Sequence, residues 1–147
     1  MRPELTFFNR QRALAFDLSL IRQVAEAARA DCLAAALSEE APLVSLDHIE
    51  VSILSDRTIA KVHGEFFDDP TPTDVITFHH GELLLGAGVV TENARQYGHH
   101  AASDEAALCV IHGMLHLAGW EDLSAKDAKK MANRQERIFK MARRVLG

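Results

Sequence analysis

The sequence predicts a single-domain fold of the α/β (α+β) class, a sandwich in which a small four-stranded mixed sheet packs with about five helices. Short segments with alternating or β-branched apolar residues occur between longer segments whose apolar residues keep helical spacing. A chain of 147 residues with 48% hydrophobic and 25% charged residues also suits one soluble globular domain with a sizeable core.

The N-terminal half predicts two strands and two helices. Residues 5–8 form a short first strand, and a long apolar stripe predicts a helix over residues 17–37 before Pro42 breaks the chain. Isoleucine and valine then alternate with polar residues, which predicts a strand over residues 48–54. A Ser-Asp turn caps a short helix over residues 57–63.

The C-terminal half predicts two further strands and three helices. The β-branched run 73–78 ends in the third strand, and residues 82–85 form the fourth. Residues 90–97 form a helix, Ser103 caps the next one, and a capping box at Ser124 opens the last. The expected core side of the last helix consists of apolar residues at helical spacing: Ala128, Met131, Ile138, Met141, Ala142 and Val145.

Charge is distributed unevenly along the chain. The net charge is −5, yet residues 123–147 hold eight Lys/Arg and only two Asp/Glu. A basic helix on an acidic protein is either a phosphate-contacting surface or an ordinary solvated helix face.

The composition also predicts a cytoplasmic protein. No apolar run approaches the ~20 residues of a membrane span, and arginines interrupt the N-terminal segment where a signal peptide would need an apolar core. The two cysteines, Cys32 and Cys109, suit a reducing compartment and provide no disulfide framework.

Residues 112–122 concentrate the candidate chemistry, with the layout His-x-x-x-His-x-x-Gly-x-x-Asp. On a helix, His112 and His116 lie one turn apart on one face, and neutral imidazole is a good ligand for zinc and similar ions. Gly119 suits the left-handed conformation that ends a helix, so the reversed chain brings Asp122 back towards the two rings. Three such ligands leave a fourth position open, as a catalytic zinc site needs.

Three neighbours of these ligands have other expected roles. Glu121 competes with Asp122 for the third ligand position, and otherwise orients a ligand or is an ordinary loop acid. Gly113 stands where zinc peptidases of the His-Glu-x-x-His kind carry their general base, so hydrolysis here needs a metal-activated water or a base from elsewhere. Cys109 lies about 10.5 Å from His116 along a helix axis, too far for a shared metal, and is expected to be buried.

Other histidines and the single tryptophan are weaker candidates. The pairs beginning at His79 and His99 are adjacent residues that do not share a face, so we expect them to be solvated loop histidines rather than metal ligands. Trp120 either stacks on a nucleobase or fills the core beside the site.

Two blocks of the chain resemble the YbeY family of bacterial metallo-endoribonucleases. Residues 112–122 resemble the family signature His-Gly-x-Leu-His-Leu-x-Gly-Tyr-Asp-His. Residues 72–78, Pro-Thr-Asp-Val-Ile-Thr-Phe, resemble the family block Pro-Thr-Asp-Val-Leu-Ser-Phe, and Gly-Glu-Leu follows where the family has Gly-Asp-Ile. The resemblance extends from about residue 46 to the end of the last helix.

The resemblance implies that residues 1–147 form a single metal-dependent endoribonuclease domain, with one zinc near the end of the motif helix and with His112, His116 and Asp122 as catalytic and metal-binding residues. It implies single-strand-specific cleavage in late-stage ribosome quality control and in maturation of the 3′ end of small-subunit (16S) ribosomal RNA. The expected partners are therefore single-stranded RNA, ribosomal RNA and the small ribosomal subunit, and neither DNA nor a membrane.

The chain departs from the family pattern at five positions. Asp122 replaces the third histidine of the signature, Trp120 replaces tyrosine and Glu121 replaces aspartate. Phe67 corresponds to a loop arginine that serves catalysis in some members, and His63 stands where asparagine is usual. Because carboxylate is a competent zinc ligand, we expect the metal site to survive.

Two alternative functions remain open from the sequence. One is a zinc metallopeptidase, which shares the ligand spacing but which Gly113 disfavours. The other is a non-catalytic ribosome-assembly factor with a structural zinc, which the altered third ligand and the missing arginine leave possible.

Overall fold

The structure of the chain, a computed structural model, describes residues 1–97 and 101–147. Its elements in chain order are β1 (Glu4–Asn9), α1 (Leu18–Ala34), α2 (Pro42–Ser45), β2 (His48–Leu54), α3 (Asp56–Phe67), β3 (Val75–Phe78), β4 (Glu82–Gly86), α4 (Ala87–Gln96), α5 (Ala102–Leu117) and α6 (Ala125–Leu146). The predicted α/β class with a four-stranded mixed sheet is confirmed, with six helices in the described part of the chain.

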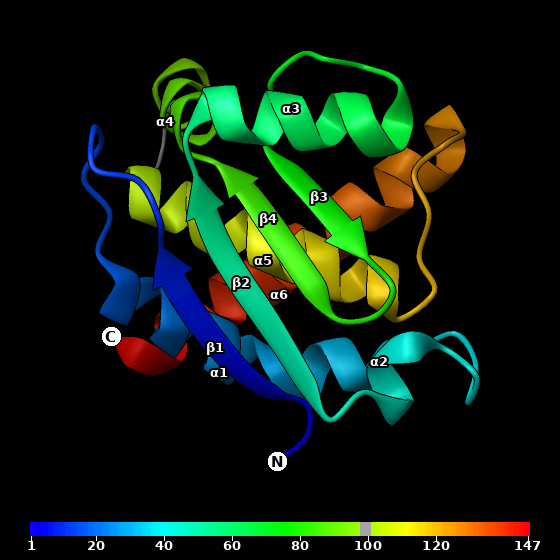
Figure 1. Cartoon of the computed structure of the whole chain (residues 1–147). Helices are drawn as coiled ribbons and strands as arrows, with labels where there is room; N and C mark the ends of the chain where they lie inside the picture. The colour runs from blue at the N-terminus through cyan, green and yellow to red at the C-terminus, as the bar shows by residue number, and fades with distance from the viewer. Residues whose placement is uncertain (98–100) are drawn as a thin grey trace.

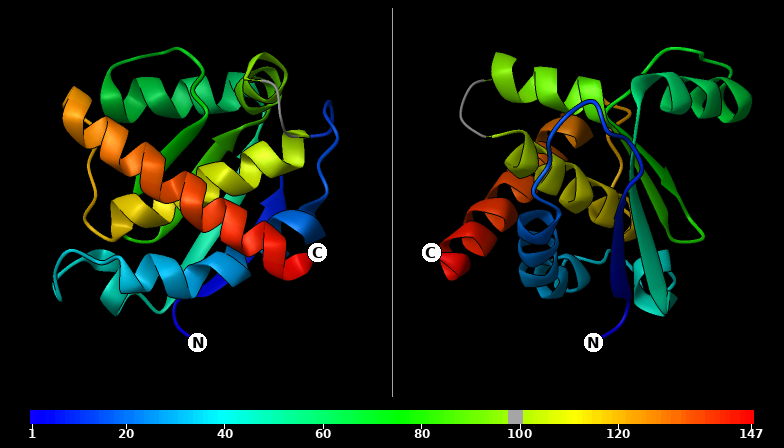
Figure 2. Two further views of the ribbon diagram at one scale, coloured as in Figure 1. Left: turned by 180° about the vertical axis from the view of Figure 1, so that it is seen from behind. Right: turned by 60° about the vertical axis from the view of Figure 1, so that its left-hand side comes forward.

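The strands form one sheet in the order β1-β2-β4-β3 (Figure 1). β1, β2 and β4 are parallel, and β3 runs antiparallel at the edge beside β4. The helices α1, α5 and α6 cover one face of this sheet, while α3 crosses the opposite face at one end of the strands (Figures 1 and 2).

Alternation along the strands divides the apolar side chains between two cores. In β4, Leu83 and Leu85 point into the large core under α1, α5 and α6, whereas Leu84 points to the other face. There Leu84 joins a smaller core with Ile59 of α3 and Ile76 of β3. This smaller core holds α3 against the edge of the sheet.

The helix α5 lies at the centre of the molecule, between the sheet and α6, with α1 beside it (Figure 2). A helix that is apolar on all sides must be buried on all sides. Within residues 106–118 every residue is buried except His112 and His116. The burial of α5 therefore leaves these two imidazoles as its accessible side chains along that stretch.

Several predicted boundaries differ from the structure. α1 ends at Ala34 rather than at residue 37, because the Leu37 N–H donates to the carbonyl of Ala118 instead of continuing the helix. α3 continues to Phe67 and ends there because the next residue, Asp68, adopts a left-handed conformation. α4 begins three residues earlier than expected, and the short helix α2, which starts at Pro42, was not predicted.

Two details of the last helices were also predicted wrongly. Ser103 does not cap α5, since its hydroxyl is buried and accepts a hydrogen bond from the Asp17 N–H at 2.8 Å. On α6, Met141 and Val145 are exposed, whereas Phe139 takes part in the core. The Ser124 hydroxyl does accept from the Asp127 N–H, as the predicted cap requires.

Candidate metal centre

The end of α5 places the two histidines and the following loop in one cluster. Gly119 has φ 102°, and its N–H donates to the carbonyl of His116. The Trp120 N–H donates to the carbonyl of Leu115, which completes a Schellman-type helix end. The chain reverses there, as the glycine predicted, and returns Asp122 to the two imidazoles.

His112, His116 and Asp122 bring one ligand atom each to within 4.8 Å of one another. The Asp122 Oδ2 lies 3.4 Å from the Nε2 of His112 and 3.6 Å from the Nε2 of His116. These separations exceed the usual N–H···O range of about 2.7–3.2 Å. They match the edges of about 3.3–3.6 Å expected between ligands that sit 2.0–2.2 Å from a tetrahedral zinc. The donor set and its spacing therefore fit a zinc ion.

Hydrogen bonds fix both imidazoles with the Nε2 atoms facing this cluster. The Nδ1 of His112 lies 2.6 Å from the Oε1 of Gln135 on α6, and the Nδ1 of His116 lies 2.9 Å from the carbonyl oxygen of Trp120. Because both partners are acceptors, each Nδ1 carries the proton and each Nε2 keeps its lone pair free for a metal.

The surroundings of His116 favour its neutral form. Burial and the neighbouring His112 lower the pKa of His116, while its bond to the Trp120 carbonyl and the Asp122 and Glu121 carboxylates act in the opposite direction. Since a protonated imidazole cannot bind a metal, the lowered pKa suits this residue to ligation at neutral pH.

A cavity of about 270 Å³ opens beside the two histidines. Its other walls come from the C-terminal half of α3, the edge strand β3 and the turn after it: His63, Phe67, Val75, Ile76, Thr77 and His79. The Nδ1 of His63 lies 2.8 Å from the carbonyl oxygen of Thr71, so this ring also has a fixed orientation with Nε2 unprotonated in its neutral form. The cluster is thus accessible from solvent and adjoins space for a substrate.

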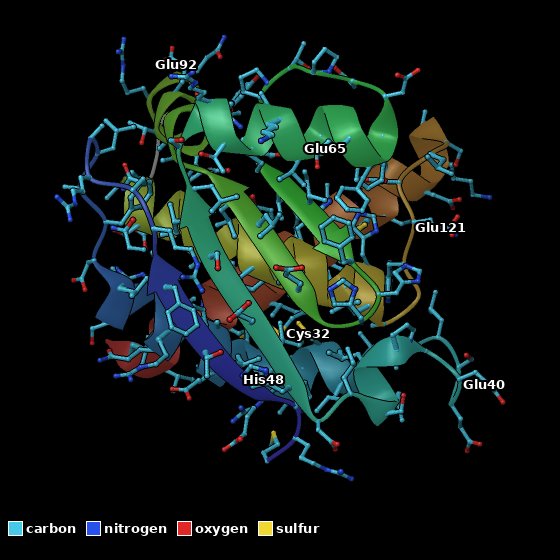
Figure 3. The ribbon with its side chains drawn as sticks, viewed as in Figure 1. Cys32, Glu40, His48, Glu65, Glu92 and Glu121 are labelled. Atoms are coloured by element: carbon cyan, nitrogen blue, oxygen red, sulfur yellow. The ribbon has the colours of Figure 1, made fainter. Side chains whose placement is uncertain are left out.

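The structure separates the predicted site residues into two groups. Asp122 lies with the two histidines, and Glu121 lies outside that cluster on the loop before α6 (Figure 3). Cys109 is buried, as expected for a small apolar residue, and burial raises the pKa of its thiol.

The remaining candidates have mixed outcomes. Trp120 packs against the core, donates its indole N–H to the Ala35 carbonyl at 2.9 Å and lies under the Arg134 guanidinium, so it fills the core beside the site. His79 lines the cavity, although we expected it to be an ordinary loop residue, while His80 pairs with Glu82. The second histidine pair lies outside the described residues.

Sequence reasoning missed Gln135 and underrated His63 and His79. Gln135 follows His112 by 23 positions, on a different helix, and no spacing rule connects the two. For His63 the one signal was its place at a position where the family usually has asparagine.

Gly113 has a packing reason as well as a chemical one. A Cβ at this position would lie 2.9 Å from both methyl carbons of Leu83 on β4 and 3.2 Å from the Thr77 hydroxyl. The absence of a side chain lets α5 approach the sheet, so position 113 has no room for the glutamate of a zinc peptidase.

The fold and the cluster define a class, an α/β protein with a candidate three-ligand metal centre at the end of a buried helix. The chain matches the family model described as Endoribonuclease YbeY over residues 8–143, and it therefore belongs to the YbeY family of endoribonucleases.

Individual relatives agree with this assignment. The chain is similar to endoribonuclease YbeY of Porphyromonas gingivalis, with 36% identity over 107 residues, covering 67% of this chain and 70% of the relative. It is also similar to endoribonuclease YbeY of Chlamydia trachomatis serovar D, with 27% identity over 146 residues, covering 91% and 84%.

A solved structure supports the fold. The solution structure of TM1509 from Thermotoga maritima matches with a TM-score of 0.63 and 23% identity, covering 94% of this chain and 88% of that one. Among the helices described here, none has both the length and the apolar character needed to cross a membrane.

Proposed function

We propose that this chain is a zinc-dependent, single-strand-specific endoribonuclease that acts in the cytoplasm on ribosomal RNA. Its substrates would be the 3′ end of small-subunit (16S) ribosomal RNA during maturation and defective small ribosomal subunits during late-stage quality control. Family membership supports the class of reaction, and the resemblance stated above supports the particular RNA.

The observation that carries the proposal is the cluster of His112, His116 and Asp122. Three ligand atoms converge at metal-ligand separations, both imidazoles are fixed through Nδ1, and the cluster opens into a cavity. A buried structural zinc would have closed, four-ligand coordination, whereas three ligands beside an open cavity are typical of a catalytic site.

The protein residues have distinct roles in this proposal. His112 and His116 supply neutral nitrogen ligands, and Asp122 supplies one negative charge. A zinc ion held there would polarise a phosphate oxygen and lower the pKa of a bound water. Either water or the ribose 2′-hydroxyl can serve as the nucleophile. The imidazole of His63, which lies in the cavity wall, is the candidate for moving a proton, because the Thr71 carbonyl holds its Nδ1 and leaves Nε2 unprotonated in the neutral ring.

The basic helix α6 is the candidate surface for phosphate contacts outside the cavity. Lys129, Lys130 and Arg137 are exposed on this helix, which follows directly on the loop of Asp122. Charge reversal at these three positions should weaken RNA binding and flatten its dependence on salt. With fewer phosphate contacts, binding releases fewer counterions. An unchanged slope of log affinity against log salt would return α6 to the role of a solvated helix face.

The test of the proposed function compares RNA cleavage with and without a chelator, beside a casein digest. We expect chelator-sensitive cleavage of a single-stranded oligoribonucleotide, no cleavage of the corresponding duplex and no proteolysis. The wild type should bind about one zinc per chain. His112→Ala and His116→Ala should each lose most of this zinc and, with it, the cleavage activity. Full zinc content in both variants would refute the site, and zinc without cleavage would favour an assembly factor.

A further inference from the structure

Three phenylalanine rings, two exposed and one half-buried, form a cluster beside the cavity, which we call the aromatic platform. It consists of Phe66 and Phe67 at the end of α3 and Phe78 at the end of β3. Phe66 is 64% exposed and Phe67 is 53% exposed, whereas Phe78 is half-buried against the smaller core. Large exposed aromatic groups gathered in one place indicate a binding surface.

Ring contacts hold the platform in a fixed arrangement. Phe78 lies edge-on to Phe66 with ring centroids 5.3 Å apart, and its ring is 6.2 Å from that of Phe67. Phe78 also stacks on His80 at 5.5 Å, and Phe67 contacts the ring of His63 at 5.8 Å. A flat ligand therefore meets rings whose orientation is already set, which lowers the entropic cost of binding.

The platform is continuous with the candidate metal centre. Phe67 lines the same cavity as His112 and His116. A ligand whose reacting group lies at the two histidines must extend over Phe67 to leave the cavity on that side. The C-terminal half of α3 lies over the β3 side of the sheet (Figure 1).

Charge around the platform disfavours the phosphate backbone as its main ligand. The residues lining the cavity include no lysine or arginine. The nearest charged neighbours in sequence are acids, Glu65, Asp68 and Asp69, and hydrogen bonds from Thr71 lower the pKa of Asp69, which keeps it ionised. The flat, largely apolar and uncharged parts of RNA are its bases, and these suit the rings of the platform better than the phosphates do.

We propose that the aromatic platform binds one or more unpaired nucleobases next to the cleavage site by stacking, without reading their sequence. This inference rests on the proposed ribonuclease function and adds how the strand is held. It also gives a physical reason for acting on single strands, since bases paired and stacked within a duplex cannot reach the rings.

The test measures binding separately from cleavage. Fluorescence anisotropy with a labelled twelve-nucleotide oligouridylate and the chelator-treated full chain is repeated for Phe66→Leu, Phe67→Leu and the double variant. Leucine keeps much of the apolar character but has no ring face. Base–aromatic stacking of about 1–3 kcal/mol predicts a loss of about 5- to 150-fold for removing a ring, and leucine should show at least the lower value. Phe67→Trp should keep or improve the affinity.

Phe8→Leu is the matched control, because Phe8 is a 39% exposed phenylalanine on β1, away from the cavity. It should bind like the wild type. An oligomer of the same length with abasic sugars should bind weakly and equally to every variant, and the slope of affinity against salt should not change in Phe67→Leu, since no phosphate contact is lost.

The possible outcomes distinguish a failure of the aromatic platform from a failure of the proposed function. If the wild type binds and cleaves RNA while both leucine variants bind equally well, the platform is wrong and the proposed function stands. If abasic and normal strands bind alike, stacking is refuted. If the wild type binds no RNA, the proposed function fails. If it instead dimerises and Phe66→Leu abolishes the dimer, the rings form an interface between copies.

Discussion

Removing the hydrogen-bond partner of His112 should weaken metal binding without touching a ligand. The Oε1 of Gln135 accepts from the Nδ1 of His112 at 2.6 Å, across the contact between α5 and α6. Gln135→Met keeps the length of the side chain and removes the acceptor. The imidazole then loses the contact that fixes its orientation and proton position, and the Nδ1–H loses its partner in a partly buried site.

The expected loss of zinc affinity follows from the surroundings of the His112 ring. Loss of such an outer partner costs about 10- to 100-fold in metal affinity, which is about 1.4–2.8 kcal/mol. An unpartnered buried donor alone costs about 1–3 kcal/mol. Because the His112 side chain is 24% exposed, water can replace part of the lost bond. We therefore expect about a tenfold loss, at the lower end of the range.

The assay is competition for zinc against a chromophoric chelator at pH 7. Gln135→Glu should retain or raise the affinity, because a carboxylate also accepts the Nδ1 proton. Gln23→Met is the control, since Gln23 is an exposed glutamine on α1 whose side chain bonds only Ser19 among the described contacts. If Gln135→Met binds zinc as tightly as the control, the contact to α6 does not orient His112 and this reasoning is refuted.

Three further predictions concern the core and the third ligand. Gly113→Ala should lower the free energy of unfolding by about 1–3 kcal/mol in urea titrations, because its Cβ would lie 2.9 Å from the buried Leu83 side chain; an unchanged midpoint would show that β4 yields freely. Cys32, whose pKa burial raises to about 12, should not react with a disulfide reagent at pH 8 until the protein is unfolded, and two thiols titrating in the native protein would contradict its packing. Asp122→Ala should lose zinc affinity and Glu121→Ala should lose less; the reverse order in the chelator assay would mean that the third ligand was wrongly assigned.

The sequence predicted the metal cluster because its determinants are local. Two histidines four apart, a glycine three residues later and a carboxylate after the turn fix their mutual positions through helix geometry and one left-handed residue. The cavity wall could not be predicted in this way. Its residues come from α3 and β3, and they meet α5 only because β3 adds to β4 at the edge of the sheet.

The wrong burial predictions on α6 also arise from packing between elements that are distant in the sequence. Helical spacing identifies an apolar stripe but allows its centre to shift by one residue. The helix packs against α1 and α5 through Met131, Ile138 and Ala142, as predicted, and adds Phe139 on the neighbouring ridge. Met141 and Val145 then rotate out of the contact. Which of two adjacent stripes is buried depends on the crossing of the helices, which the sequence of one helix does not contain.

The hydrogen bonds that end α1 early also fix the position of the loop that carries Asp122. The Leu37 N–H donates to the carbonyl of Ala118 at the end of α5, and the Ala35 carbonyl accepts the indole N–H of Trp120. Had α1 continued through residue 37, the Leu37 N–H would bond within the helix and Ala118 would lose this partner. Trp120 in turn offers its own carbonyl to the Nδ1 of His116. The chain between Ala35 and Leu37 thus anchors the turn that orients one imidazole and returns Asp122 to the cluster. Its backbone N–H and carbonyl groups therefore contribute to the geometry of the metal centre.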